Sequence, residues 1–153
     1  MAGSARGLFR ATGKTARPVM ADLIDGKPVY LDEVPREKDD FYPTPPEPTR
    51  AILQAEGSRL NGFGSIWEPA CGDGAMTREM EATGLSVISS DMVDRGVGAN
   101  LRSFYDFSTA PSKAILTNPP FNECNSGEWI RHALDRLNVE YMALLLPLSW
   151  PGA

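Results

Sequence analysis

Short runs of apolar residues recur along this chain and are separated by segments with helical spacing. The runs cover residues 65–67, 85–89, 114–117 and 141–146. Each is almost continuously apolar instead of alternating with polar residues, and glycine, proline or aspartate lies close to its end. Such runs are typical of strands that are buried on both faces of a sheet. A weaker strand or turn is expected at residues 104–105.

Helices are predicted between these strands. The prolines from Pro46 onwards suit a first helical turn, and Gly57 is expected to end that helix. A second helix follows the glycines at 72 and 74 and stops at Gly84. Ser126 is expected to cap a third helix, whose apolar positions repeat at helical spacing: Trp129, Ile130, Ala133, Leu134 and Leu137.

Strands that alternate with helices predict an α/β fold. We expect a Rossmann-like, mostly parallel sheet with helices on both faces, formed by residues 41–153. Residues 1–40 have a glycine- and arginine-rich start and a mixed-charge end, and are predicted to be a flexible N-terminal tail. Ligands of such sheets bind beyond the carboxyl ends of the strands, near the point where strand order reverses.

Composition narrows the class of protein. The 153 residues carry a net charge of −5, and their two cysteines and one histidine favour reduced thiols and no zinc site. No apolar run approaches the ~20 residues that span a bilayer, and no apolar segment follows the basic start, so a cytoplasmic protein is expected. Basic residues without acids gather at the N-terminus: Arg6, Arg10, Lys14 and Arg17. The acidic remainder argues against tight nucleic-acid binding by these residues alone.

The segment Asn118-Pro119-Pro120-Phe121 ends the predicted strand at 114–117. Two prolines cannot extend a helix and remove two donors from a sheet ladder, so the strand stops abruptly and its end is stiff. That end carries an amide, a backbone carbonyl and an aromatic ring. These groups suit a planar group that bears nitrogen, although an ordinary strand followed by a loop fits the four residues equally well.

Three other predicted strand ends carry candidate ligand-binding residues. Residues 68–74 form a glycine-rich turn that lets a ligand approach the backbone and the start of a helix. Asp91 is placed as a ribose-binding carboxylate would be, and Asp106 could accept from an adenine amine, with Phe107 or Met92 against the ring. Taken singly, each acid could equally be a turn or loop residue.

In their order along the chain, four motifs resemble class I S-adenosylmethionine-dependent methyltransferases. They are Tyr42-Pro43-Thr44-Pro45-Pro46, Glu68-Pro69-Ala70-Cys71-Gly72-Asp73-Gly74, Ser90-Asp91 and Asn118-Pro119-Pro120-Phe121. The resemblance covers residues 41–149 and is strongest to the DNA adenine-N6 type, including forms found in phages. It implies a seven-stranded sheet, of which this chain supplies four or five strands. The chain is therefore expected to be shortened at its C-terminus, with a partner or a missing region completing the sheet.

The resemblance also implies roles for individual residues. It implies that the cofactor S-adenosyl-L-methionine binds to the following residues: Tyr42, Thr44, Pro45, Glu68, Ala70, Cys71, Gly72, Gly74, Asp91, Met92, Asp106 and Phe107. Among these, Thr44 and its neighbours would contact the methionine carboxylate, Asp91 the ribose and Asp106 the adenine amine. The catalytic residues would be Asn118, Pro119, Pro120 and Phe121. Asn118 and the Pro119 carbonyl would accept hydrogen bonds from the target amine, and Phe121 would stack on its ring.

The expected reaction is methylation of the N6 amine of an adenine flipped out of DNA. Two acceptors on the amine hydrogens would localise the nitrogen lone pair, so positioning and electrostatics suffice and no metal is implied. Two alternatives stay open from the sequence. The same Asn-Pro-Pro-Phe segment could serve methylation of RNA or of a protein glutamine, or the chain could be a non-catalytic remnant that binds the cofactor.

Overall fold

The computed structural model describes residues 20–24, 27–30 and 43–147. The chain divides into two units, Met1–Asp40 and Phe41–Ala153. In the first unit, strands β1 (Met20–Ile24) and β2 (Lys27–Tyr30) pair antiparallel. The segment predicted as a flexible tail therefore includes a short hairpin.

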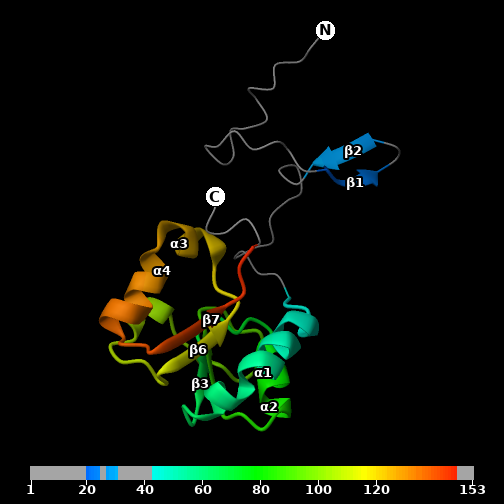
Figure 1. Ribbon diagram of the computed structural model, residues 1–153. Helices are drawn as coiled ribbons and strands as arrows, with labels where there is room; N and C mark the ends of the chain where they lie inside the picture. Colours follow the sequence, from blue (N-terminus) through cyan, green and yellow to red (C-terminus); the bar gives the residue numbers. More distant parts are fainter. Residues whose placement is uncertain (1–19, 25–26, 31–42, 148–153) are drawn as a thin grey trace. The chain divides into compact units, whose positions relative to one another are not determined.

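The second unit is an α/β fold with one five-stranded sheet among its described residues (Figure 1). Its elements, in chain order, are α1 (Pro46–Asn61), β3 (Ile66–Glu68), α2 (Ala75–Ala82), β4 (Val87–Asp91), β5 (Asn100–Leu101), the 3₁₀ turn η3 (Phe104–Asp106), β6 (Ala114–Thr117), α3 (Phe121–Ser126), α4 (Glu128–Arg131), the π-helical turn η4 (His132–Arg136) and β7 (Tyr141–Leu144). All neighbouring strands are parallel, in the order β5-β4-β3-β6-β7. The predicted Rossmann-like class is confirmed.

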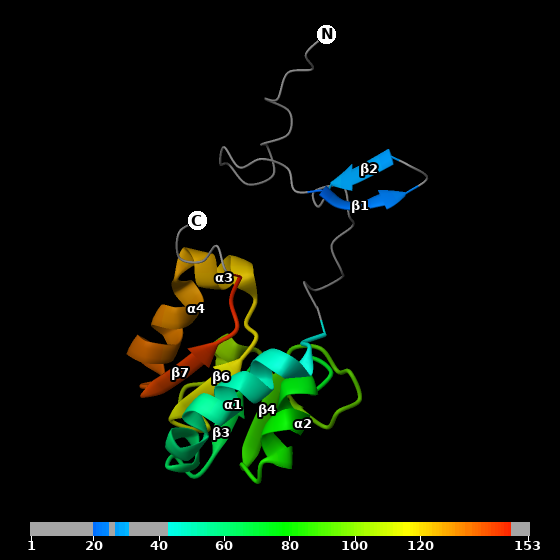
Figure 2. The same ribbon diagram turned by 45° about the vertical axis from the view of Figure 1, so that its right-hand side comes forward.

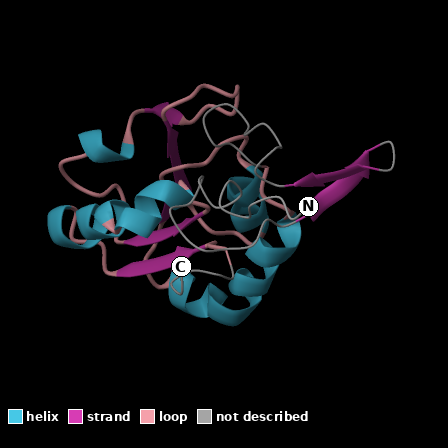
Figure 3. Ribbon diagram, turned by 90° about the horizontal axis from the view of Figure 1, so that it is seen from above, coloured by secondary structure: helices cyan, strands magenta, loops and turns pink. Residues whose placement is uncertain are grey.

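Helices cover both faces of the sheet (Figures 2 and 3). Successive residues of β3 point to opposite faces, so Ile66 packs with the α1–α2 side and Trp67 with the α3–α4 side. The layer at α1 and α2 is aliphatic and sulfur-rich: Leu53, Leu60, Ile66, Met76, Met80, Ala114 and Leu116. The opposite layer is rich in aromatic rings: Trp67, Phe104, Phe107, Ile115, Cys124, Trp129, Ala133, Leu137 and Val139. Both faces of the central strands are thus buried, as their apolar runs predicted.

Several element boundaries differ from the prediction. Helix α1 continues past Gly57 to Asn61, because Leu53 and Leu60 both pack into the core from the same helix. Burying these leucines outweighs the ~1 kcal/mol that a glycine costs inside a helix. The edge strand β5 forms at residues 100–101, whereas residues 104–105, expected as a weak strand, form the turn η3.

The third helix begins earlier than predicted. Its first turn, α3, starts at Phe121 directly after the two prolines, and Gly127 interrupts it with φ of 72°. Ser126 still assists the restart, because its hydroxyl accepts a hydrogen bond from the Glu128 amide (3.3 Å). The early start puts the aromatic ring of the motif on the first residue of a helix.

Candidate functional site

The order of the strands brings the predicted strand ends to one edge of the sheet. Strand β3 lies between β4 and β6, with Glu68 opposite Ser89 and Trp67 opposite Ile115. The chain moves outward from β3 to β4 and β5, then crosses back to β6 on the other side of β3. Strand order therefore reverses between β3 and β6. The glycine-rich turn follows β3 and the Asn118 segment follows β6, so each comes directly after one of the two strands at the reversal.

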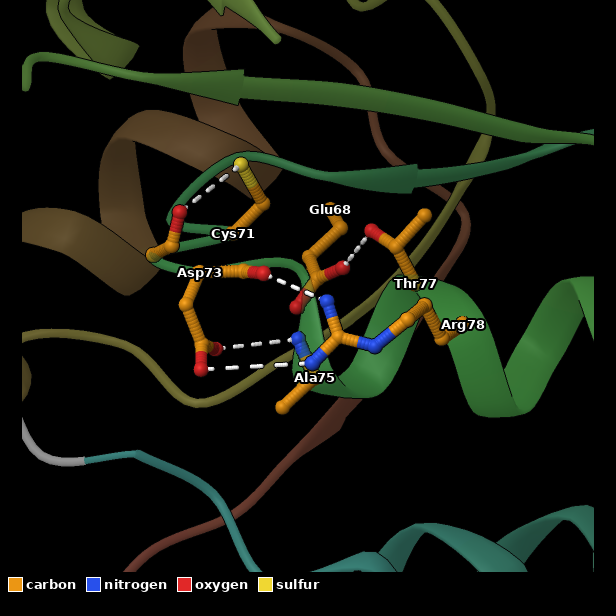
Figure 4. Close-up of polar contacts among 7 residues, drawn as sticks. Glu68, Cys71, Asp73, Ala75, Thr77 and Arg78 are labelled. Carbon is orange, nitrogen blue, oxygen red and sulfur yellow. Dashed lines mark hydrogen bonds and ion pairs between the residues drawn. The ribbon is translucent and has the colours of Figure 1, made fainter. Parts of the chain in front are cut away.

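Hydrogen bonds fix the glycine-rich turn to the end of β4. The Cys71 amide donates to the Ser90 carbonyl (3.1 Å), and the Gly72 amide donates to Asp91 Oδ2 (2.7 Å). Gly72 and Gly74 have φ of 55° and 75°, a left-handed conformation that residues with a Cβ atom disfavour. Helix α2 begins directly after Gly74, and Asp73 Oδ1 accepts from the Ala75 amide (3.1 Å) at that start (Figure 4).

Asp91 is held on both of its carboxylate oxygens. Besides the Gly72 amide on Oδ2, Oδ1 accepts from the Val93 amide (3.0 Å) and lies 3.6 Å from an Arg95 guanidinium nitrogen. Each oxygen of an ionised carboxylate can accept more than one hydrogen bond, so capacity for hydroxyl donors remains. Arg95 was not predicted as part of the site, although its position four residues after Asp91 was a usable signal.

Glu68, the last residue of β3, is buried and forms a hydrogen-bonded chain with two hydroxyls. Figure 4 shows the first link, between Glu68 and Thr77. Its carboxyl group bonds to the Thr77 hydroxyl, which lies 2.7 Å from the Ser89 hydroxyl. Burial raises the pKa of Glu68 to about 8, while the hydrogen bonds to Thr77 oppose that rise. Glu68 is therefore mostly protonated at neutral pH and can act as a donor as well as an acceptor.

Cys71 has no nucleophilic role in this arrangement. Its side chain is buried, and burial raises the pKa of the thiol to about 12. The thiol sulfur lies 3.9 Å from the Gly72 carbonyl oxygen (Figure 4). Since the thiolate is the nucleophilic form, the thiol is unreactive at neutral pH, and the residue contributes through its backbone.

Asn118 has one satisfied and one unsatisfied end. Its Nδ2 donates to Thr44 Oγ1 (3.1 Å), which joins two motifs 74 residues apart. Its Oδ1 is buried and has no hydrogen-bond partner among the described residues. The neighbouring Pro119 carbonyl likewise receives no hydrogen bond from the described part of the chain. Two acceptors on adjacent residues are thus without a hydrogen-bond donor among the described residues.

The remaining predicted residues differ in how far they are exposed. Met92 is 70% exposed, and the exposed Asp106 carboxylate has no partner within residues 43–147. Phe107 instead lies in the core, where its ring is 4.8 Å from the Trp67 ring and 4.5 Å from the Arg102 guanidinium. Phe121 is half-buried. The packing leaves Met92, more than Phe107, accessible to a bound ring.

Three further predicted residues have no polar side-chain group that could bind a ligand. Pro45 is exposed and immediately precedes α1, Ala70 is half-buried in the turn, and Pro120 immediately precedes α3. Tyr42 lies outside the described residues.

A pocket of about 390 Å³ lies beside the start of α2. It is lined by Gly74, Thr77, Arg78, Glu81, Val87, Ser89, Val97 and Gly98. Of the residues predicted from the sequence, only Gly74 lines it, so it is distinct from the acceptors at Asn118. Among the described residues, no group of three or more His, Cys, Asp or Glu side chains could hold a metal ion, and no helix is long and apolar enough to cross a membrane.

Comparison with known proteins adds no assignment. A scan against protein-family models, a search of curated proteins and a search of solved structures each return no match.

Proposed function

We propose that this chain transfers a methyl group from S-adenosylmethionine to the N6 amine of an adenine flipped out of DNA. The observation that carries the proposal is the buried Oδ1 of Asn118 beside the Pro119 carbonyl, both without a hydrogen-bond partner within the described residues. A buried acceptor without a donor is costly, and a ligand that brings an N–H group would remove that cost.

The strand order supports the same proposal. Numbered along the chain, the five strands lie in the order 3-2-1-4-5, which is the order of a doubly wound nucleotide-binding sheet up to its fifth strand. Ligands of these sheets bind at the point where strand order reverses, which here lies between β3 and β6. A nucleoside-bearing cofactor and the Asn118 acceptors would then share one edge of the sheet.

The residues around the turn fit the proposed cofactor. The left-handed turn at Gly72 and Gly74 allows close approach to the backbone, and the Asp91 carboxylate retains acceptor capacity for ribose hydroxyls. Asp106 is exposed and unpaired within the described residues, so it is available to accept from an adenine amine. The cofactor, when bound, would supply the methyl group from its positively charged sulfonium.

The chain's own groups would then act on the target amine. An adenine amine is a weak nucleophile because its lone pair is delocalised into the ring. Hydrogen bonds to Asn118 Oδ1 and to the Pro119 carbonyl would draw the nitrogen towards a pyramidal geometry and localise that lone pair. The half-buried Phe121 ring, at the start of α3, would offer a stacking surface to the flipped base.

Labelled S-adenosylmethionine tests the proposal when duplex DNA, RNA and protein are offered separately. We expect label on N6 of adenine in DNA, and at least a ~100-fold loss of rate in Asn118→Ala, the scale seen when one transition-state hydrogen bond is removed. Asn125→Ala is the matched control, because Asn125 is an exposed asparagine in α3.

Other outcomes contradict the proposal in distinct ways. Label on RNA or on a protein glutamine would keep the Asn118 chemistry but change the substrate. Cofactor binding by calorimetry, without transfer to any substrate, would indicate a non-catalytic binding protein. No cofactor binding would contradict both and, with them, the role of Asp91.

A further inference from the structure

The side chains of Tyr105 and Glu123 join two segments beside the proposed site. Tyr105 lies in η3 directly before Asp106, and Glu123 lies in the first turn of α3, two residues after Phe121. The Tyr105 hydroxyl donates a hydrogen bond to Glu123 Oε2 over 2.7 Å. A carboxylate only accepts hydrogen bonds, so the direction of this bond is fixed. The bond connects the segment before Asp106 to the helix that begins at Phe121.

The ring of Tyr105 is held by two other rings. Its centroid lies 5.5 Å from that of Phe104 and 5.0 Å from that of His132, and both pairs are edge-to-face. Phe104 in turn stacks on the core residue Trp129 at 4.1 Å. Burial, and then the hydrogen bond to Glu123, raise the pKa of the Tyr105 hydroxyl, so it stays protonated and remains a donor. The hydroxyl therefore reaches α3 from a ring that is packed onto the core.

Helix α3 has few other contacts that could fix its orientation. It has six residues and no side-chain cap at its start, and Gly127, with φ of 72°, separates it from α4. Of its side chains, only Cys124 is fully buried. Among the described residues, Glu123 makes the only side-chain hydrogen bond from α3 to an element other than α4.

Two contacts on different sides of a helix fix its rotation about its own axis. Successive residues of an α-helix are ~100° apart around that axis. Cys124 packs into the core, Glu123 lies ~100° from it on one side, and Phe121 lies ~60° from it on the other. With Cys124 in the core and Glu123 bonded to Tyr105, α3 is held against rotation. The half-buried Phe121 ring then keeps its direction.

We propose that Tyr105 is a positioning residue, which acts through Glu123 to hold the ring of Phe121 where the flipped base stacks. This inference rests on the proposed function and adds to it a residue that need not touch the cofactor or the base. Stacking on Phe121 binds the base in the ground state and in the transition state alike. Losing the Tyr105 hydroxyl should therefore raise KM for DNA and leave kcat unchanged.

Hydrogen exchange tests the positioning without catalysis. The Cys124 amide donates to the Pro120 carbonyl (3.2 Å) and closes the first turn of α3. We expect this amide to exchange roughly threefold to tenfold faster in Tyr105→Phe, which keeps the ring and loses one net hydrogen bond. Tyr141→Phe is the matched control, because the Tyr141 hydroxyl also donates to a glutamate, Glu56 (3.4 Å), but from β7 to α1. Equal exchange in Tyr105→Phe and the native protein would overturn the inference, whether or not the protein is active.

A double-mutant cycle separates positioning from a general loss of stability. In Tyr105→Phe, the KM for DNA should rise roughly threefold to tenfold, with kcat and the Kd for the cofactor unchanged. In a Phe121→Leu background, which lacks the stacking ring, Tyr105→Phe should have no further effect on KM, because the hydroxyl acts through that ring.

Three results would contradict these expectations. Effects of the two substitutions that multiply independently would overturn the inference. A weakened cofactor with unchanged KM for DNA would overturn it in favour of a role through the neighbouring Asp106. If the native protein transferred no methyl group, the proposed function would fail, while the exchange measurement would still show whether Tyr105 holds α3.

Discussion

Replacing Glu68 with glutamine should change how the stability of the protein depends on pH. Glu68 is 1% exposed at the end of β3, and burial raises its pKa from the ordinary 4.5 to about 8. The folded protein therefore keeps a proton on this carboxyl group over a pH range in which the unfolded chain has lost it. Glutamine has a similar shape, keeps an oxygen for the Thr77 hydroxyl and cannot titrate.

The magnitude follows from linkage between proton binding and folding. Above about pH 4.5, the unfolded state binds fewer protons than the folded state, so the free energy of unfolding falls as pH rises. The slope is ~1.4 kcal/mol per pH unit and it persists until Glu68 ionises in the folded state near pH 8. The stabilisation that protonated Glu68 contributes is thus complete below the pKa of this group in the unfolded chain, and it is lost by about pH 8. Between about pH 5 and pH 8, the native protein should lose ~4 kcal/mol relative to Glu68→Gln.

Urea unfolding followed by far-ultraviolet circular dichroism measures this difference at several pH values. Subtracting the two curves removes every titration that the proteins share. Glu79→Gln is the matched control: Arg50 lowers the pKa of Glu79, so this residue stays ionised across the range in both states. Parallel stability curves for the native protein and Glu68→Gln would refute the reasoning, because they would mean that Glu68 ionises as readily in the fold as in the unfolded chain.

Three further predictions concern packing, backbone and charge. Ser90→Ala removes the acceptor of the buried Trp67 indole N–H (2.9 Å) and should cost about 1–3 kcal/mol in urea unfolding; a cost near zero would contradict this. Gly127→Ala should cost about 1–2 kcal/mol, since its φ of 72° is a left-handed conformation that residues with a Cβ atom disfavour, whereas Gly57→Ala, in open space inside α1, should stabilise by about 0.5–1 kcal/mol. Asp91→Asn should weaken cofactor binding roughly tenfold by calorimetry, and unchanged affinity would exclude the ribose assignment.

Much of the fold could be predicted because apolar runs specify buried parallel strands without reference to the rest of the chain. Residues 114–117 form β6 as predicted, and Met76 and Met80 face the core from α2. Boundaries set by tertiary packing could not be predicted. Gly57 did not end α1, because a leucine one turn further on is completely buried.

The candidate site was predictable only at the level of strand ends. Parallel strands bring their carboxyl ends to one edge, so residues that follow β3, β4 and β6 were expected to be neighbours. The direction of each side chain is decided by packing that a single sequence does not reveal. The ring of Phe107 could have faced a ligand or the core, and it lies in the core. The bond from Asn118 to Thr44 spans 74 residues and has no local signal.

The unequal composition of the two hydrophobic layers has an optical consequence. Both tryptophans of the described residues, Trp67 and Trp129, belong to the layer at α3 and α4, while aliphatic and sulfur-containing side chains fill the layer at α1 and α2. Replacing Trp150, which lies outside the described residues, would confine indole emission to a single layer. Fluorescence would then report the loosening of that layer alone, and a separation between fluorescence and dichroism transitions would reveal that the two layers melt independently.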